Sequence, residues 1–214
     1  MPTKLKTGET ILFIGDSITD CDRRDDRYRP LGWGYVRMMN DMLTIREPQK
    51  KITVLNRGIA GDTVIHLRNR WTDDALALKP DWLSVKIGIN DVGRMLEGTM
   101  DMPPEKFEEN YDFILSQTVK CLPKCNLLLI DPFFMSRDKL KDSHRSRVLK
   151  ILPEYISVVH RMSRKYKTKL VKTHALFQEQ LKHHPLSTFS PEPVHPNSAG
   201  HLLIAETVYK ALCR

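Results

Sequence analysis

Few features of this sequence mark a specialised class of protein. Its 214 residues contain only four cysteines, which are too few and too scattered for the disulfide framework of a small secreted domain. Cys121 and Cys125 lie four positions apart, but no Cys or His pair at zinc-ligand spacing accompanies them. We therefore interpret the cysteines as structural thiols, and we expect neither a metal nor a cofactor.

Long apolar runs are also missing. No stretch approaches the ~18 consecutive apolar residues of a membrane span, and residues 1–8 lack the apolar core of a signal peptide. We expect a cytoplasmic protein that does not bind a membrane. Hydrophobic residues make up 41% of the chain and charged residues 28%, a balance that excludes a disordered or fibrous protein. Without a repeat or linker, residues 1–214 are predicted to form a single domain.

Acidic residues are fewer than basic residues. The chain has 34 Lys and Arg against 26 Asp and Glu, and residues 136–172 alone hold 12 basic and 3 acidic residues. A basic field attracts polyanions such as nucleic acid. However, the same segment fits one solvated helix face, and it has few aromatic residues for base stacking and no recognisable nucleic-acid-binding motif. A nucleic-acid partner is therefore not expected.

Short apolar runs alternate with helical patterns along the chain. The runs predict strands at Thr10 to Ile14, Ile52 to Asn56, Trp82 to Ile87, Asn126 to Ile130 and Leu170 to Lys172. Each run is continuous, as in strands that are buried on both faces. The helical patterns cover Trp33 to Leu43, Thr63 to Leu76, Pro104 to Leu122, residues 148–162 and a last segment from Ser198. This alternation predicts an α/β protein with a parallel sheet covered on both faces.

Three helical details can be tested directly. The stripe in Pro104 to Leu122 predicts that Val119 is buried, and the last helix is expected to bury Leu202, Leu203, Val208 and Leu212. Pro153 is expected to kink or divide the helix around it, because proline removes a backbone hydrogen bond.

Glycine and polar residues follow the predicted strands. The first strand runs into Gly15-Asp16-Ser17-Ile18-Thr19, the second into residues 56–63, and the third into Gly88-Ile89-Asn90-Asp91, while residues 192–197 precede the last helix. Ligands bind beyond the carboxyl ends of parallel strands, so we expect these segments to meet in one site. Each segment alone also fits an ordinary turn or helix cap, and only their joint occurrence favours a site.

Four of these blocks closely resemble the GDSL or SGNH hydrolase superfamily of serine esterases: GDSIT around Ser17, NRGIAGDT around Gly61, GIND around Asn90 and VHPN around His195. The resemblance spans nearly the whole chain and implies a flavodoxin-like, three-layer α/β/α sandwich with a five-stranded parallel sheet. The longer runs ILFIGDSITDCDR, RWTDDALALKPDW, KIGINDV and HPNSAGH look nearest to bacterial acetylesterases that act on acetylated xylooligosaccharides. Homo-oligomers are also implied, without a defined order.

The resemblance assigns roles to matching residues. Ser17 would attack the acyl carbon, and His195 would take the serine proton and pass it to the leaving alcohol. The backbone N–H groups of Ser17 and Gly61 and the side-chain amide of Asn90 would hold the oxyanion. Asp16 is expected to organise the turn at the serine rather than to react, and Asp91 to hold the loop at Asn90.

One position departs from the family pattern. The family usually has an aspartate three residues before the histidine, and here that residue is Glu192. Glutamate completes the triad in other serine hydrolases, but its extra methylene changes the reach. We predict a Ser17, His195, Glu192 triad. A weakened enzyme, or a backbone carbonyl as the partner of His195, remains as an alternative.

The substrate depends on loops, which the sequence describes less well. Residues 92–102 and 133–142 are predicted loops, and Trp33, Phe133 and Phe134 are candidates to line an acyl pocket or stack on a sugar, although a core role fits Trp33 equally. Without a large apolar surface, short acyl groups are favoured, acetyl first. The alternatives are a lysophospholipase, thioesterase or arylesterase of the same fold, or a non-catalytic protein that binds carbohydrate or polyanions. The other seven histidines are expected to pack or to face solvent.

Overall fold

The computed structural model describes residues 2–213, in which five strands form one parallel sheet in the order β2-β1-β3-β4-β5. The strands are β1 (Thr10–Gly15), β2 (Thr53–Gly58), β3 (Trp82–Lys86), β4 (Asn126–Ile130) and β5 (Lys169–Val171). All five predicted strands are confirmed, with some ends shifted. The second ends two residues later than predicted, because its pairing with β1 continues as far as Gly15 and Gly58.

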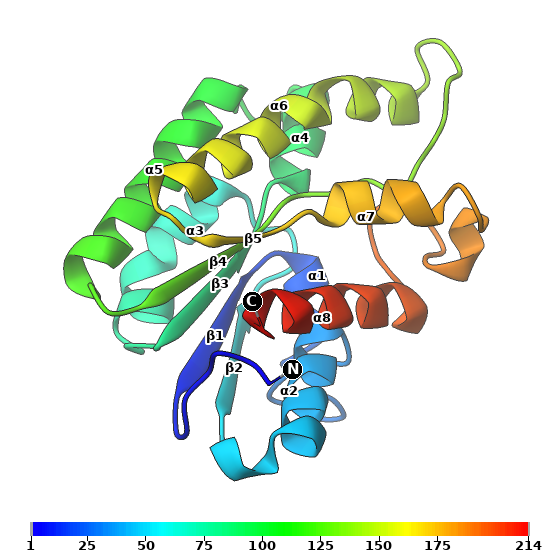
Figure 1. The fold of residues 1–214 in the computed structure, drawn as a ribbon. Helices are drawn as coiled ribbons and strands as arrows, with labels where there is room; N and C mark the ends of the chain where they lie inside the picture. The colour runs from blue at the N-terminus through cyan, green and yellow to red at the C-terminus, as the bar shows by residue number, and fades with distance from the viewer. Residues whose placement is uncertain (1, 214) are drawn as a thin grey trace.

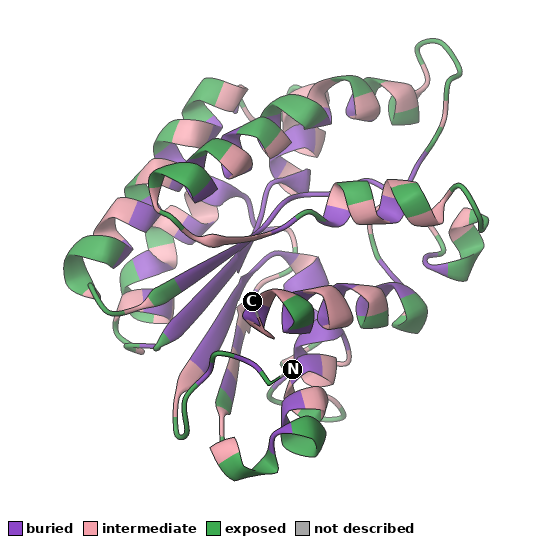
Figure 2. Ribbon diagram, viewed as in Figure 1, coloured by how far each residue is buried: buried purple, intermediate pink, exposed green. Residues whose placement is uncertain are grey.

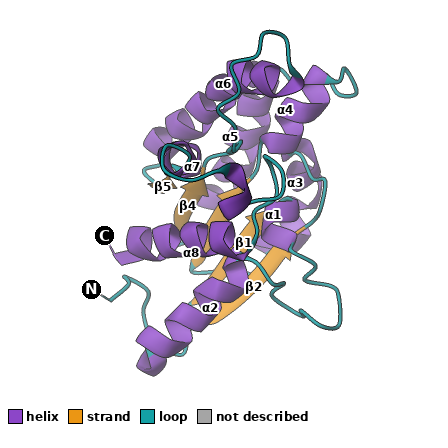
Figure 3. Ribbon diagram, turned by 90° about the vertical axis from the view of Figure 1, so that its right-hand side faces the viewer, coloured by secondary structure: helices purple, strands orange, loops and turns teal. Residues whose placement is uncertain are grey.

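Helices cover both faces of the sheet (Figure 1). On one face α2 (Tyr35–Arg46) packs on α8 (Ser198–Cys213), and on the other α3 (Val64–Trp71), α5 (Pro104–Cys121) and α6 (His144–Lys165) pack side by side. The other helices, α1 (Ser17–Asp20), α4 (Ile89–Leu96) and α7 (Thr173–Gln180), follow β1, β3 and β5. The fold is the expected three-layer α/β/α sandwich, and Figure 3 shows α1 at the end of β1.

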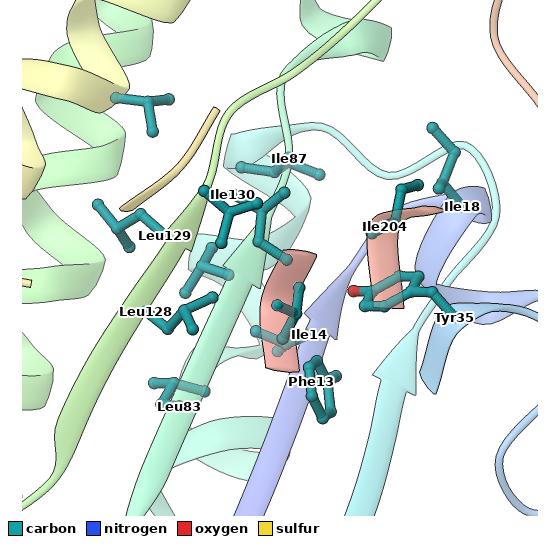
Figure 4. Packing of buried hydrophobic residues seen from close by; sticks show 14 of the residues in the cluster. Phe13, Ile14, Ile18, Tyr35, Leu83, Ile87, Leu128, Leu129, Ile130 and Ile204 are labelled. Carbon is teal, nitrogen blue, oxygen red and sulfur yellow. The ribbon is translucent and has the colours of Figure 1, made fainter. Parts of the chain in front are cut away.

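The core is centred on the middle strands (Figure 2). Every residue of β3 is buried, and residues 11–14 of β1 have no exposed surface, so the continuous apolar runs are explained by burial on both faces. In Figure 4 the rings of Phe13 and Tyr35 lie together, and their centroids are 5.6 Å apart. The edge strand β2 differs, because its buried and less buried residues alternate.

Several details of the helices differ from expectation. Pro153 does not divide its helix: it lies inside a continuous α6, where buried residues on both sides of it, including Leu152 and Tyr155, hold the helix against the core. Leu202 is 51% exposed and Val119 is 46% exposed, and Leu203 is only partly buried. Burial of Val208 and Leu212 is confirmed, and they share the buried stripe of α8 with Gly200, His201, Ile204, Ala205 and Tyr209.

The segment after β3 was expected to be a loop, but its first part belongs to α4. This helix runs from Ile89 to Leu96, and it buries Ile89, Asp91 and Val92. A helix directly after the strand fixes residues 90 and 91 more firmly than a loop would. Asn90 and Asp91, two residues of the expected site, therefore lie in a helix.

The basic segment 136–172 includes the whole of α6. Two of its cations pair with α5: Arg161 with Glu108, and Lys165 with Asp112. Part of its charge is thus neutralised within the protein. Across residues 2–213, none of the helices has the length and apolar character needed to cross a membrane.

Candidate active site

Ser17, His195 and Glu192 form one hydrogen-bonded chain. Ser17 begins α1 directly after β1, and the other two residues lie in the loop before α8. Ser17 Oγ is 2.9 Å from His195 Nε2, and His195 Nδ1 is 2.6 Å from Glu192 Oε1. Because Nδ1 faces a carboxylate, we assign the proton to Nδ1, which leaves the Nε2 lone pair facing the serine hydroxyl. The fold thus joins side chains that are 178 positions apart in the sequence.

The carboxylate of Glu192 is fixed from three directions. Besides the ring of His195, it accepts the backbone N–H of His195 at 2.6 Å and that of Val194 at 2.7 Å. Partial burial alone would raise the pKa of Glu192, but the hydrogen bonds from these groups outweigh it and lower the pKa. The longer side chain therefore turns back within its own loop and stays ionised beside the histidine.

The turn that carries Ser17 rests on a buried ion pair. Asp16 Oδ1 accepts the backbone N–H of Ile18 at 3.0 Å, which caps α1, and Lys86 Nζ lies 3.1 Å from Asp16 Oδ2. Lys86 ends β3 beside Gly15, and its side chain is 1% exposed. Burial lowers the pKa of Lys86, although Asp16 opposes that effect. Asp16 organises the turn, as expected, whereas its partner Lys86 is visible in the sequence only as a charge in an apolar strand.

Gly61 and Asn90 lie together at the ends of β2 and β3. Asn90 Nδ2 donates to the carbonyl of Asp62 at 2.9 Å, and Arg94 Nη2 donates to the carbonyl of Gly61 at 2.9 Å. Gly61 has φ of +81°, a conformation that glycine adopts without strain. An amide nitrogen carries two protons, so Asn90 keeps one for a ligand while the other holds the loop. The backbone N–H of Ser17 is at the start of α1, where helical N–H groups lack a partner within the helix.

Asp91 also stabilises the loop after β2. Its side chain has no exposed surface, and Oδ1 accepts the backbone N–H of Val64 at 3.0 Å. Burial raises the pKa of Asp91 to about 7, more than the hydrogen bond from Val64 lowers it. Asn90, Asp91 and Arg94 of α4 therefore fix the position of the loop after β2.

A pocket with a volume of about 230 Å³ opens beside the serine. Its lining includes Ser17, Cys21, Asp22, Trp33, His195 and His201. His201 Nδ1 accepts the backbone N–H of Tyr35 at 3.2 Å, so Nε2 carries the proton and faces Cys21 Sγ at 3.3 Å. Burial lowers the pKa of His201 to about 3, and this wall of the pocket stays uncharged at neutral pH.

The three candidate substrate residues separate in space. Trp33 lines the pocket, whereas Phe133 has no exposed surface and Phe134 is 4% exposed. Phe133 packs on Phe177 with 4.6 Å between ring centroids, and the backbone N–H of Met135, which follows Phe134, donates to the carbonyl of Pro193. The expectation that Phe133 and Phe134 contact a substrate is therefore corrected: both side chains are buried, and Met135 beside them bonds the loop that carries Glu192 and His195.

Sequence reasoning grouped His201 with the histidines that pack or face solvent, and it treated Cys21 as a structural thiol. His201 is buried, but it also lines the pocket, and a place in the HPNSAGH run just after His195 is the signal that could have found it. Cys21 could not have been paired with it, because 180 positions separate them. Among residues 2–213, no cluster of three or more His, Cys, Asp or Glu side chains is arranged to hold a metal.

Known proteins are similar to this chain in sequence and in fold. Residues 13–203 match the GDSL-like lipase/acylhydrolase family. The acetylxylan esterase of Geobacillus stearothermophilus is 34% identical over 98% of this chain and 96% of its own, and its crystal structure superposes with a TM-score of 0.88. An α/β hydrolase from the metagenome of Lake Arreo, Spain, is 30% identical over 97% of this chain and 96% of its own, with a TM-score of 0.85.

Both likenesses run through nearly the whole length of the chains compared, and the family match begins inside β1 and ends inside α8. The chain therefore belongs to the GDSL-like lipase/acylhydrolase family and is a hydrolase of carboxylic esters.

Proposed function

We propose that the protein is a serine esterase that removes acetyl groups from short acetylated carbohydrates, such as xylooligosaccharides. The observation that carries the proposal is the continuous chain from Ser17 through His195 to Glu192, with distances of 2.9 Å and 2.6 Å, at the mouth of a small pocket. Such a chain is the machinery of acyl transfer through a serine ester.

In the first half of the reaction, Ser17 Oγ forms a bond to the acetyl carbon while its proton moves to His195 Nε2. The carbonyl oxygen becomes an oxyanion, which accepts hydrogen bonds from the backbone N–H groups of Ser17 and Gly61 and from Asn90. The bond to the sugar oxygen then breaks, and His195 returns the proton to that oxygen. Glu192 stabilises the imidazolium while it exists.

In the second half, water replaces the sugar. His195 accepts a proton from water as its oxygen attacks the acetyl carbon bound to Ser17, the same donors hold the second oxyanion, and the proton returns to Ser17 Oγ as acetate leaves. The neutral wall formed by Cys21 and His201 adds no competing base on that side of the pocket.

Two observations support acetyl as the acyl group: the size of the pocket and the activity of a similar protein. The pocket volume of about 230 Å³ is below the ~300–1,000 Å³ of sites for drug-sized ligands, so the pocket does not hold a long acyl chain together with a sugar ring. The relative from Geobacillus stearothermophilus is an acetylxylan esterase, and its solved structures include catalytic mutants of a serine, an aspartate and a histidine. In this chain Glu192 stands for the acid.

The test is acetate release from peracetylated xylobiose by the wild type, by Ser17→Ala and by Ser157→Ala. Ser157 is an exposed serine of α6 whose hydroxyl bonds a helix carbonyl, so it controls for the loss of a hydroxyl. We expect release by the wild type and Ser157→Ala, and none above background by Ser17→Ala.

Absence of release by the wild type would reject the sugar ester as substrate. A series of 4-nitrophenyl esters and thioesters of increasing acyl length then separates the alternatives. Rates that fall steeply beyond butyryl indicate a short-acyl esterase, and rates that rise with length indicate a lysophospholipase or thioesterase. No turnover of any ester would indicate a binding protein.

A further inference from the structure

Trp33 differs from the other tryptophans of the chain. Trp71 is 2% exposed and Trp82 is 5% exposed, so both pack in the interior, whereas Trp33 is only partly buried and lines the pocket that contains Ser17 and His195. A tryptophan beside a nucleophile offers a large flat apolar surface to the part of the substrate that enters the pocket.

Two contacts fix the orientation of this indole. Trp33 Nε1 donates to Asp22 Oδ2 at 3.0 Å, and the ring meets that of His201 edge to face, with centroids 4.9 Å apart and an interplanar angle of 85°. His201 is itself held by the backbone N–H of Tyr35 and by Cys21. The ring is therefore set before a ligand arrives, which reduces the entropy lost on binding.

The backbone around the ring is shaped for this placement. Cys21 and Asp22 have φ values of 42° and 58°, which non-glycine residues rarely adopt. Gly32 and Gly34 flank the tryptophan, and a Cβ on either would lie 2.4 Å from an atom of the segment Asp20 to Cys21. Such strain persists where the surrounding structure enforces it, and it gathers at functional sites.

Asp22 has a second oxygen available. Within residues 2–213, Oδ1 has no hydrogen-bond partner, and the side chain forms no ion pair. A pyranose ring offers an apolar face of C–H groups and an edge of hydroxyl donors. A carboxylate beside an indole that lines the pocket matches both features.

We propose that Trp33 and Asp22 form the subsite for the sugar ring that carries the acetyl group, with Trp33 under the ring face and Asp22 accepting a ring hydroxyl. This inference rests on the proposed function, because it describes how the same site recognises a carbohydrate ester. It makes Trp33 and Asp22 specificity residues, which act on binding of the leaving group rather than on the acyl carbon.

The test compares a sugar ester with a small ester that has no ring. For wild type and variants we would measure kcat/KM for acetylated xylobiose and for ethyl acetate, and take the ratio. We expect Trp33→Leu to lower this ratio roughly tenfold, mainly through KM for the sugar ester, and Asp22→Asn to lower it by a factor of about three. Asparagine tolerates the left-handed backbone, so that variant removes the charge without added strain.

Matched controls are available on the surface. Phe113→Leu removes an exposed aromatic ring of α5, and Asp26→Asn removes a carboxylate four positions from Asp22 that is 89% exposed. Neither residue lines the pocket, so both variants are expected to keep the wild-type ratio.

A second readout does not depend on turnover. Because the other two tryptophans are buried, Trp33 should dominate any change in indole fluorescence when acetylated xylobiose is added to Ser17→Ala. The change should vanish in Ser17→Ala combined with Trp33→Leu.

The outcomes separate the two proposals. A wild type that hydrolyses ethyl acetate but not the sugar ester overturns the carbohydrate function itself. A wild type that hydrolyses the sugar ester, together with a Trp33→Leu ratio equal to that of Phe113→Leu and no fluorescence change in Ser17→Ala, overturns the subsite alone.

Discussion

Lys86 and Asp16 form a buried ion pair directly behind the candidate nucleophile. Lys86 Nζ lies 3.1 Å from Asp16 Oδ2, the two side chains are 1% and 0% exposed, and the ring of Phe133 lies 5.0 Å from the ammonium on another side. Asp16 caps the helix that starts at Ser17, so the pair connects the end of β3 to the position of the serine.

Replacing Lys86 with methionine should be strongly destabilising. The change leaves the carboxylate of Asp16 buried without its partner, and breaking such a pair costs about 3–5 kcal/mol. Urea unfolding measures the loss. Lys165→Met removes an exposed cation paired with Asp112 and should cost no more than about 1 kcal/mol.

The double variant Lys86→Met with Asp16→Asn tests whether the unpaired carboxylate causes this loss of stability. Asparagine can still accept the backbone N–H of Ile18, but it carries no charge that needs a partner. We expect the double variant to be more stable than Lys86→Met alone. Equal stability of the two would mean that the cost comes from packing of the lysine stem.

Replacing Glu192 with glutamine should abolish most turnover while the fold persists. The amide no longer stabilises the imidazolium and allows the wrong tautomer of His195, and the matching change in another triad lowers kcat on the order of 10⁴-fold. Steady-state kinetics with an acetyl ester measure the effect. Glu179→Gln is the control, since Glu179 faces His183 at 3.7 Å on the surface. An unchanged kcat in Glu192→Gln would remove Glu192 from the mechanism.

Replacing Asn90 with alanine should lower kcat by roughly 10²–10³-fold with little change in KM, because the lost hydrogen bond strengthens only as the oxyanion forms. Asn126→Ala removes a similar bond, from Nδ2 to the carbonyl of Asp81 at 3.3 Å, at the other end of the sheet. It should leave kcat unchanged. If instead KM rises in Asn90→Ala and kcat holds, Asn90 binds the ground state rather than the oxyanion.

Asp91 should make the protein less stable as the pH rises from about 4 to 7. Burial raises its pKa from 3.8 to about 7, so over this range the folded chain keeps a proton that the unfolded chain has released. The contribution is complete below about pH 4 and is lost as the pH rises to 7, by about 4 kcal/mol at most.

The measurement is the free energy of unfolding of wild type and Asp91→Asn at several pH values. The variant, which cannot titrate there, should gain stability relative to the wild type as the pH increases. Asp26→Asn should follow the wild type throughout, because Asp26 is exposed. A constant difference between wild type and Asp91→Asn would contradict the raised pKa.

Much of the scaffold is visible in the sequence, because its signals are local. The run at residues 126–130 is apolar and is preceded by Pro123 and Lys124, and it matches β4 at both ends. The start of α4 was hidden, since Gly88 and Asn90 suit a turn and Gly93 weakens the helical pattern. Tertiary contacts of Asp91 and Arg94 stabilise the helical conformation of that segment.

Local sequence patterns do not reveal residues whose role depends on partners far away in the chain. The motif blocks located Ser17, His195 and Asn90, but Lys86 gains its role from Asp16, 70 positions away. Phe133 is an apolar residue in a predicted loop, and only the packing of Phe177 and of the loop before α8 shows that it faces inward. Burial of loop side chains depends on which chain segments cover them.

The burial of Cys21 determines how the pocket reacts with covalent reagents. Its thiol is 7% exposed, and burial, together with the charges of Asp22, Asp20 and Asp16, raises its pKa far above the usual range. A thiol that stays protonated reacts slowly with alkylating agents and oxidants, because the thiolate is the nucleophile. The pocket thus holds a sulfur and an oxygen nucleophile side by side, yet covalent labelling should select the oxygen of Ser17.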